Sequence, residues 1–513
     1  MNGKVHSTEE LLVPPDLLNP FVHRLELSTT YDKIKTAIFT VIVLPFRVLA
    51  IFMLLTMAWI LACVGLVGLS EKELRQRPIT GWRRDTKAMV CWAMRALFLF
   101  GGFHWVTVRG KQASAKDAPI LALASHSTYF DALPVVLMGG PSVVAKGETG
   151  RLPFFGKLIN YTQPIYVWRE DPNSRQNTIK EIIDRATSDQ DWPQVLIFPE
   201  GTCTNRSCLI TFKPGAFYPG VPIQPVCIRY PNKLDTVTWT WEGPGALKLL
   251  WLTLTQVHSS CEIQFLPVYT PNEDEKQDPK LYANNVRRLM AKHLGIPVSD
   301  YTYDDCRLMT KAKRMNLPFA SELVEVQKLR QKLGLSQANI EEKILTQSPH
   351  IITNEGGQIS YKEFARRLEV PSTNEVLQQL FRLYDKDCAG IIDFREYLLG
   401  VLVISKASNV AEMVELAFKI FDRGGKGNVS QSDACKALYH TLAMPSEEAQ
   451  RVFRQIDTAG RGCITFDGFR EYARRKSDYS HVFRRQEEEE EKKAATKLQV
   501  YDFHNANYKT KAE

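Results

Sequence analysis

The sequence predicts a mixed α/β sheet domain flanked by helices, preceded by an N-terminal membrane helix or hairpin and followed by an all-α domain. Three observations predict this order. An apolar run without formal charge occupies residues 48–69, and short apolar strands alternate with helical stretches over residues 109–310. Residues 320–478 repeat their apolar positions at helical spacing, with polar, glycine-containing loops between them. A chain of 513 residues is long enough to give each part its own core.

The composition narrows the classes of function. The formal net charge of +8 is spread along the chain, and no segment combines dense Lys and Arg with interleaved aromatic residues, so we expect no nucleic-acid partner. A modest positive charge suits a protein that rests on an anionic membrane surface. The 10 cysteines are scattered without a C-x-x-C pair, which predicts reduced thiols in the cytosol rather than disulfides or a zinc site.

The N-terminal part divides into a polar arm, residues 1–36, and a membrane region, residues 37–108. We expect the arm to be loose, because it is polar and carries paired prolines. The run Val48–Leu69 has the length of a helix that spans the hydrocarbon core of a bilayer. Apolar residues also precede it, but Pro45 and Arg47 interrupt them, so a single span and a re-entrant hairpin both fit.

The flanks of this run predict its orientation. A second apolar stretch, Met89–Trp105, carries Arg95 in its middle, which favours a helix lying at the membrane interface. More basic residues follow the run than precede it, so the positive-inside rule predicts a cytosolic main body. The charged tail, residues 479–513, carries Lys509 and Lys511 at the spacing of a dilysine retrieval signal of the endoplasmic reticulum, and a solvated basic tail fits the same residues.

Two apolar strands of the central domain end in polar motifs. Ile120–Ala124 runs into His126, and Val195–Phe198 runs into Glu200. In open α/β sheets, ligands bind beyond the carboxyl ends of the strands, so both motifs are expected at one cleft. Three further segments are expected as strands: Pro164–Trp168, Val221–Ile228 and Ile263–Val268.

The first motif is His126-Ser-Thr-Tyr-Phe-Asp131. Histidine is the side chain best suited to general base catalysis near neutral pH, and a carboxylate on its Nδ1 atom would fix its tautomer. Across a strand-to-helix turn the two side chains can meet. No nucleophile is evident nearby, so the simplest chemistry is direct deprotonation of a substrate hydroxyl. An Asp131 that only caps a helix would satisfy the same spacing.

The second motif begins with Glu200, Gly201 and Thr202 and continues to Arg206. The backbone N–H groups of a Gly-Thr turn can bind an anion, and the cations of Arg206 and Lys213 suit a phosphate. The alternative is a surface turn with solvated charges.

Two neighbouring segments complete the predicted site. The strand Pro164–Trp168 would deliver Arg169 to the same edge of the sheet. The proline-rich segment Val221–Val226 is apolar enough to line an acyl or CoA channel, and its prolines are equally typical of an edge strand.

The helical C-terminal part contains the pattern of a calcium loop. Residues 385–396 fit the 12-residue EF-hand loop, with glycine at its sixth position. The predicted ligands are the side chains of Asp385, Asp387, Asp393 and Glu396 and the backbone carbonyl of Ile391. Ala389 leaves the fifth position without a side-chain oxygen, which predicts weak binding. Three other loops lack enough ligands and are expected to be metal-free: those from Asp422 and Asp457, and the remnant 352–363.

In their order along the chain, the motifs of the central domain resemble the four sequence blocks of the glycerolipid acyltransferase family. The blocks correspond here to His126-x4-Asp131, Arg169, Glu200-Gly-Thr-x3-Arg206 and Val221-Pro-Ile-Gln-Pro. The longer string from Phe198 to Phe217, with a membrane helix before it and EF-hands behind it, is similar to the lysophosphatidylcholine acyltransferase branch, which includes lyso-platelet-activating-factor acetyltransferase. Ser125 departs from the family's pattern, in which proline precedes the histidine, but this exchange removes no chemical group.

The resemblance implies an acyl transfer, with His126 as the base on the glycerol hydroxyl of a lysophospholipid and Asp131 as its orienting partner. The hydroxyl would attack the thioester of acyl-CoA or acetyl-CoA, and nearby N–H groups would stabilise the oxyanion. The residues implied in binding glycerol, phosphate or CoA are Glu200, Gly201, Thr202, Arg206, Arg169 and Lys213. This chemistry implies no catalytic metal and no redox cofactor, so calcium is expected only in the EF-hand loop.

The resemblance also implies a place in phospholipid biosynthesis, with membrane phospholipid and lysophospholipid as partners. We expect the endoplasmic reticulum membrane, with the Golgi and lipid droplets as alternatives, and cytosolic catalytic and EF-hand domains. Two rival interpretations fit less well. A hydrolase would use a G-x-S-x-G elbow, which does not surround a strand-end serine. A membrane-tethered calcium-binding scaffold with an inactive acyltransferase domain is disfavoured by the intact His126, Glu200 and Arg206.

Overall fold

The structure, a computed structural model, describes residues 19–168, 173–314, 320–335, 339–347, 357–385, 387–407, 409–423 and 425–476. The chain divides into two compact units between Cys306 and Arg307. The predicted site residue Arg169 and the two tail lysines, Lys509 and Lys511, lie outside the described residues.

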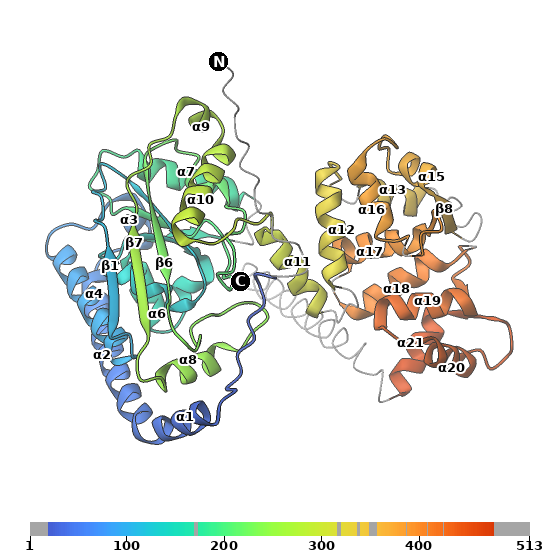
Figure 1. Ribbon diagram of the computed structural model, residues 1–513, viewed down its shortest axis with the longest axis horizontal. Coiled ribbons are helices and arrows are strands. Elements are labelled where there is room, and N and C mark those ends of the chain that lie inside the picture. Colours follow the sequence, from blue (N-terminus) through green and yellow to red (C-terminus); the bar gives the residue numbers. More distant parts are fainter. Residues whose placement is uncertain are drawn as a thin grey trace, which may run out of the picture. The chain divides into compact units, whose positions relative to one another are not determined.

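The first unit is built on a seven-stranded sheet with the order β1-β7-β6-β2-β5-β3-β4. Figure 1 labels its strands β1, β7 and β6. Its strands are β1 (Trp105–Arg109), β2 (Ile120–Ala124), β3 (Ser142–Lys146), β4 (Ile165–Val167), β5 (Val195–Ile197), β6 (Ile223–Arg229) and β7 (Ser260–Phe265). β6 and β7 pair antiparallel, whereas the other neighbours run parallel. The mixed sheet is therefore confirmed, although sequence patterning missed β1 and β3.

Helices cover both faces of this sheet. They are α4 (Trp82–Phe100), α5 (Ala132–Leu137), α7 (Ser174–Ala186) and α10 (Pro279–Leu294). Alternate residues of β2 point to opposite faces. Leu121 packs in a cluster with Phe98 of α4 and Leu133 of α5, whereas Ile120 packs in the cluster that contains Tyr282 of α10. Because β2 is buried throughout, its C-terminal end is a firm support for the residues that follow it.

The remaining elements of the first unit are short. They are α3 (Glu71–Gln76), η1 (Tyr129–Asp131), η2 (Gly147–Arg151), α6 (Phe155–Tyr161), η3 (Pro214–Ala216), α8 (Ala246–Leu254), α9 (Glu273–Gln277) and the start of α11 (Tyr303–Arg314).

The proline-rich segment forms a central strand. β6 lies between β7 and β2, so the edge-strand interpretation is wrong. Pro225 pairs with Ala122 of β2. The pairing of β6 with β7 starts only at the next residue, Val226, so the missing N–H of Pro225 interrupts little of that ladder. Residues 223–228 are all buried, so this stretch forms core rather than the wall of an open channel.

The apolar run forms α2 (Leu44–Leu66), the one helix among the described residues that is long and apolar enough to cross a membrane. Pro45 lies in its first turn, where a missing N–H costs nothing, so the helix begins upstream of the expected start. α1 (Thr30–Ile42) precedes it. α2 packs beside α4 (Figure 1). Its Gly65 lies so close to the ring of Tyr161 in α6 that no larger residue would fit.

Arg47 attaches the other end of α2 to the first unit. Its buried guanidinium donates hydrogen bonds to the carbonyl groups of Leu254, Gln256 and Val257, at 2.8, 2.7 and 3.1 Å. These carbonyls belong to the last residue of α8 and to the residues just after it, where no further turn of helix could satisfy them. Both ends of α2 are therefore held against other elements of the first unit.

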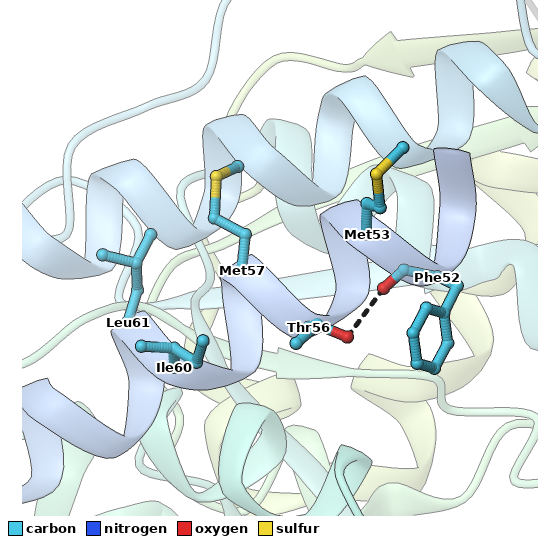
Figure 2. Close-up of a pocket in the computed structure, with 6 residues that line it drawn as sticks. All are labelled: Phe52, Met53, Thr56, Met57, Ile60 and Leu61. Carbon is cyan, nitrogen blue, oxygen red and sulfur yellow. Dashed lines mark hydrogen bonds between the residues drawn. The ribbon is translucent and has the colours of Figure 1, made fainter. Parts of the chain in front are cut away.

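One face of α2 is apolar and largely exposed, and Figure 2 shows side chains that lie on it. A shallow groove there is lined by Phe52, Met53, Thr56, Met57, Ile60 and Leu61. All six residues come from the one helix, and the hydroxyl of Thr56 donates to the carbonyl of Phe52 at 2.8 Å. The groove thus offers hydrocarbon rather than polar anchors.

Part of the N-terminal arm docks on the first unit instead of lying loose. Phe21 is buried and packs edge-on against Tyr301, with the ring centroids 5.8 Å apart. Its neighbour Val22 bridges to Glu242, and the side-chain amide of Asn205 donates to the carbonyls of Asn19 and Val22. The composition of the arm gave no sign of this, because one buried phenylalanine is enough to anchor a short segment.

The second unit contains two pairs of EF-hand-like helix-loop-helix motifs. Its helices are α12 (Ala320–Lys332), α13 (Asn339–Gln347), α15 (Tyr361–Arg367), α16 (Glu375–Arg382), α17 (Phe394–Lys406), α18 (Val410–Phe421), α19 (Gln431–Leu442), α20 (Ser446–Ile456) and α21 (Phe466–Arg475). Short strands join the loops in pairs: β8 (Gln358–Ser360) with β9 (Ile391–Asp393), and β10 (Asn428–Ser430) with β11 (Cys463–Thr465). Even the degenerate loops therefore keep the pairing of EF-hands, through Ile359 with Ile392 and Val429 with Ile464.

Candidate active site

The predicted histidine and aspartate meet directly. Nδ1 of His126 lies 2.7 Å from Oδ2 of Asp131, just beyond the C-terminal end of β2. The same oxygen accepts hydrogen bonds from the N–H groups of Ser127 and Thr128, at 2.9 and 3.2 Å. These contacts close the turn into η1, so the local backbone itself holds the carboxylate against the imidazole. The His126 side chain is 22% exposed, which leaves it open to a substrate.

Opposing effects set the charge of His126. Burial lowers the pKa of its imidazole, but Cys203 and the Asp131 carboxylate raise it by more, so the pKa lies well above 6.5. The ring of Phe198 stacks on the imidazole, with the centroids 4.2 Å apart. The arrangement therefore orients Nε2 toward the loop of the second motif.

Tyr230 completes the support of Asp131 and was missed by sequence reasoning. Its hydroxyl donates to Oδ1 of Asp131 at 2.7 Å, and both side chains are buried. Tyr230 follows β6 directly, and β6 is the parallel neighbour of β2, so both strands end at the same edge. A tyrosine just after a central strand was the signal available, but it required the strand order.

The carboxyl group of Glu200 contacts the backbone of His126 and is not exposed to a ligand. It is completely buried, and its Oε1 accepts a hydrogen bond of 2.7 Å from the backbone N–H of His126, while Thr204 Oγ1 lies 3.4 Å from Oε2. Burial raises the pKa of this carboxyl group to about 7. The side chain therefore joins the second motif to the first.

Cys203 faces the catalytic candidate. Its Sγ lies 3.6 Å from Nε2 of His126, and the N–H of the next residue, Thr204, donates to the His126 carbonyl at 2.8 Å. The loop that carries Glu200 is thus wrapped around the histidine. Cys203 stands inside the second motif, yet nothing in its spacing marked it as a neighbour of the imidazole.

Arg206 is part of an ion pair. Its Nη2 atom donates to Oδ2 of Asp235 at 2.6 Å, and its Nη1 atom donates to Ser127 Oγ at 3.1 Å. The guanidinium also lies over the ring of Tyr230, 5.4 Å from the centroid. The predicted anion-binding cation is therefore beside the base, with a carboxylate partner that the motif did not reveal.

The rest of the second motif is covered by the start of α11. Gly201 has a φ of 69°, and the stem of Lys213 lies so close to it that a Cβ atom would be 2.9 Å from Lys213 Cε. Nζ of Lys213 lies 3.4 Å from the ring centroid of Tyr303, and Thr202 Oγ1 lies 3.6 Å from Cys306 Sγ. The structure thus gathers every predicted site residue of the central domain that it describes.

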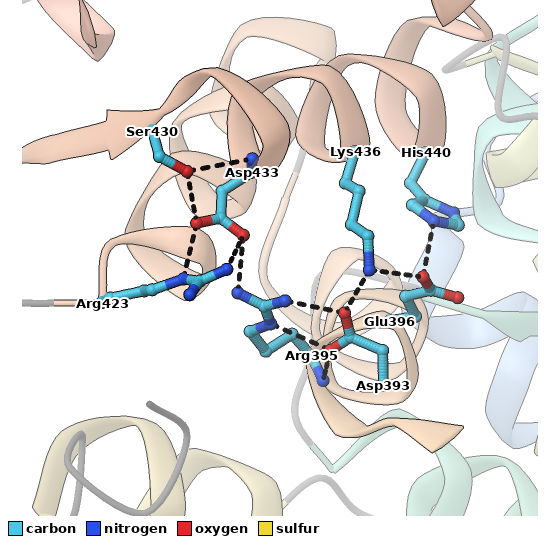
Figure 3. A network of polar contacts seen from close by, with 8 residues as sticks. All are labelled: Asp393, Arg395, Glu396, Arg423, Ser430, Asp433, Lys436 and His440. Atoms are coloured by element: carbon cyan, nitrogen blue, oxygen red, sulfur yellow. Dashed lines mark hydrogen bonds and ion pairs between the residues drawn. The ribbon is translucent and has the colours of Figure 1, made fainter. Parts of the chain in front are cut away.

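The predicted calcium loop holds the protein's own cations near two of its ligands (Figure 3). Oδ1 of Asp393 accepts from Arg395 Nε at 2.9 Å, and its Oδ2 lies 2.8 Å from Lys436 Nζ. Oε1 of Glu396 lies 3.4 Å from His440 Nε2 and 3.8 Å from Lys436 Nζ. At the other end of the loop, Asp385 accepts the backbone N–H of Gly390 at 3.1 Å, the contact that closes such a loop.

The donor set therefore fits calcium in residue type but not in its present arrangement. Among the described residues, no three His, Cys, Asp or Glu side chains are grouped for a metal ion. Side-chain cations also take up a ligand of the loop from Asp422. The carboxylate of its last acidic residue, Asp433, is buried, 2.7 Å from Arg423 Nε and 2.9 Å from Arg395 Nη1. An ion in either loop would have to displace side-chain cations.

Comparisons with known proteins match both units. The family described as Acyltransferase matches residues 105–229, and the EF-hand domain pair matches residues 411–474, which excludes the loop at 385–396. Lysophosphatidylcholine acyltransferase of Drosophila melanogaster is 44% identical over 471 residues, covering 91% of this chain and 88% of that protein. Lysophosphatidylcholine acyltransferase 2 of Homo sapiens is 44% identical, covering 92% and 85%, and lysophosphatidylcholine acyltransferase 1 of Rattus norvegicus is 45% identical, covering 92% and 88%.

A solved structure also matches. The crystal structure of the 1-acyl-sn-glycerophosphate acyltransferase PlsC from Thermotoga maritima is 15% identical with a TM-score of 0.33, and the match covers 52% of this chain and 96% of that one.

Proposed function

This chain belongs to the lysophosphatidylcholine acyltransferase family and is an acyltransferase, and from that premise we propose that it transfers a fatty acyl group from acyl-CoA to the free glycerol hydroxyl of lysophosphatidylcholine. The observation that supports this reaction best is the contact of 2.7 Å between His126 Nδ1 and Asp131 Oδ2. It leaves Nε2 as the only ring nitrogen that can take a proton from a substrate. Lyso-platelet-activating factor with acetyl-CoA is a second pair of substrates for the same chemistry.

In the proposed mechanism, Nε2 of His126 removes the proton of the glycerol hydroxyl. The alkoxide oxygen forms a bond to the thioester carbonyl carbon, and the resulting tetrahedral oxyanion collapses with cleavage of the C–S bond. The thiolate of CoA leaves and takes up the proton from the imidazolium. Asp131 stabilises the imidazolium meanwhile, and Tyr230 and the N–H groups of Ser127 and Thr128 hold Asp131 in place.

The acceptor hydroxyl would occupy the place that Cys203 Sγ now has, 3.6 Å from Nε2. Gly201, Thr202 and Arg206 are proposed to bind the glycerol and phosphate, and Lys213 to assist with phosphate or CoA. Arg169, outside the described residues, is proposed for the same task. Glu200 has a positioning role in this scheme, because its carboxyl group holds the backbone of His126 rather than facing solvent.

The substrate is a membrane lipid, and α2 is proposed to hold the enzyme on the bilayer. Arg47 and Gly65, near the two ends of α2, contact the end of α8 and Tyr161 of α6, so a helix crossing the membrane alone would have to break these contacts. A hairpin in which α2 and α4 lie in one leaflet keeps them and presents the exposed apolar face of α2 to lipid. These contacts favour an arrangement in which α2 does not cross the bilayer as a single span. The catalytic unit is further proposed to lie on the cytosolic face of the endoplasmic reticulum.

The test is an acyl-transfer assay on microsomes that express wild type or His126→Ala. Labelled palmitoyl-CoA or acetyl-CoA is offered with several lysophospholipids. We expect transfer to lysophosphatidylcholine, reduced in the variant by about 100-fold or more, the scale of a lost general base. Transfer by wild type no higher than in empty microsomes would refute the reaction, and undiminished transfer by His126→Ala would refute the role of the histidine.

A further inference from the structure

We propose that Asp235 selects lysophospholipids whose head group carries a positive charge beyond the phosphate, as a choline head group does. This inference rests on the proposed function, because it assigns the head-group end of the same site. Asp235 lies outside the predicted motifs and beyond residue 229, where the match to the acyltransferase family ends.

The ion pair of Arg206 carries the inference. One end of the guanidinium is 3.1 Å from Ser127 Oγ, one residue from the base, and the other end is 2.6 Å from Asp235 Oδ2. The side chains of Arg206 and Asp235 are 16% and 28% exposed, so both charges are partly accessible from solvent and can be reached by a head group. A phosphate that binds Arg206 therefore has a carboxylate as its neighbour.

Charge complementarity decides which head group binds best beside this ion pair. The pair presents one positive and one negative charge side by side. A zwitterionic head group places its phosphate against Arg206 and its cation against Asp235, whereas an anionic head group leaves Asp235 facing negative charge. Like charges repel more strongly where protein replaces part of the water. The ion pair therefore favours a zwitterion over an anion of similar size.

Asp235 can attract choline although its lone pairs are already used. Its Oδ2 accepts from Thr238 Oγ1 at 2.6 Å, and its Oδ1 accepts from the N–H groups of Val237 and Thr238. A quaternary ammonium group has no N–H to donate, so it requires a fixed negative charge and not a free acceptor. The same segment carries Trp239, whose side chain is 40% exposed, and an aromatic face is the other usual partner of a quaternary ammonium.

The experiment separates charge from shape with two acceptors. One is lysophosphatidylcholine, and the other is its carbon isostere, in which a 3,3-dimethylbutyl group replaces choline and only the positive charge is lost. The full-length wild type, Asp235→Asn and the matched control Asp191→Asn, which breaks an exposed pair with Arg84, are assayed in neutral detergent micelles with palmitoyl-CoA. We expect wild type and control to favour choline about tenfold in kcat/KM, and Asp235→Asn to lose this preference.

Equal use of both acceptors by the wild type would overturn the proposal, and this measurement needs no variant, so misfolding of Asp235→Asn cannot hide the answer. A preference that survives in a folded Asp235→Asn would overturn it as well. So would an unchanged KM for lysophosphatidylcholine in Arg206→Gln, since the phosphate contact would then be elsewhere while acyl transfer itself stands. The failure of the proposed function looks different, because no acceptor would then be acylated by any of these proteins.

Discussion

The hydroxyl of Tyr230 donates a hydrogen bond of 2.7 Å to Oδ1 of Asp131. The other carboxylate oxygen holds His126, so this buried aspartate is fixed between a tyrosine and the imidazole. β6 delivers Tyr230 and β2 delivers the turn that contains Asp131, and the two strands are parallel neighbours. The sheet thus positions the base through a residue about a hundred positions away in sequence.

Tyr230→Phe should lower kcat about tenfold with little change in KM. The substitution leaves a buried carboxylate oxygen without its donor and loosens the orientation of His126, but it removes no atom that would touch the substrate. Steady-state kinetics with lysophosphatidylcholine and palmitoyl-CoA measures both constants. Tyr282→Phe is the matched control, because that buried hydroxyl donates to the carbonyl of Val221, and its kcat should stay at the wild-type value.

The reaction rate should rise with pH above 6.5. Burial lowers the pKa of His126, but Cys203 and Asp131 raise it by more, well above 6.5, and only the deprotonated imidazole can act as a base. Asp131→Asn removes one of the raising contacts, so the rising limb of kcat/KM should move to lower pH. Its plateau should fall about 100-fold as the imidazole loses its orientation. A limb that stays in place in Asp131→Asn would show that another group controls it.

Glu200→Gln should change how stability depends on pH. Burial raises the pKa of Glu200 from 4.5 to about 7, so the folded protein binds this proton more tightly than the unfolded chain. The contribution of Glu200 to the free energy of unfolding is therefore greatest below pH 4.5. It falls as the pH rises through about 7, by about 3 kcal/mol in all. Glutamine has no such charge, can still accept the N–H of His126, and can donate to the Thr204 hydroxyl.

Thermal unfolding of the full-length protein checks this sign. The Tm of Glu200→Gln minus that of wild type should increase between about pH 5 and pH 8. Glu273→Gln, at a carboxylate with 80% side-chain exposure, should show a nearly constant difference over the same range. A difference for Glu200→Gln that shrinks as the pH rises would contradict the raised pKa.

The parts of the site that follow apolar strands were predictable from local signals. His126 and Glu200 each come after such a strand, and the structure brings them together at the edge where β2 and β5 end. The direction in which the Glu200 side chain points was not predictable in the same way. The resemblance implied that Glu200 binds glycerol, whereas its carboxyl group lies in the interior, because burial depends on what the rest of the chain places over it.

The supporting residues could not be predicted, for a different reason. Tyr230, Asp235 and Tyr303 carry no local pattern, and they reach the site only through the strand order and the return of the chain at the start of α11. The position of β6 was equally hidden, since its prolines indicate an edge and only the register shows that Pro225 falls where pairing with β7 ends.

Tyr303 should affect substrate binding through Lys213. The ammonium group lies 3.4 Å from the ring centroid, an arrangement in which the ring attracts the cation and holds it in place. We expect Tyr303→Leu to raise the KM for lysophospholipid or acyl-CoA about threefold to fivefold, with kcat unchanged, because the ring is lost. Tyr303→Phe keeps the ring and should behave as wild type. If both variants raise KM equally, the hydroxyl rather than the ring is responsible.

Lys436→Met should strengthen calcium binding by the loop at residues 385–396. Nζ of Lys436 lies 2.8 Å from Asp393 and 3.8 Å from Glu396, so a calcium ion has to displace an ammonium group from two of its predicted ligands. Methionine keeps most of the length without the charge, and the affinity should increase about tenfold. Equilibrium dialysis of the full-length protein with radioactive calcium measures this, at fixed pH and ionic strength. Asp385→Asn should weaken binding in both backgrounds, which would assign the ion to this loop, whereas unchanged binding in Lys436→Met would mean that the ammonium group does not compete.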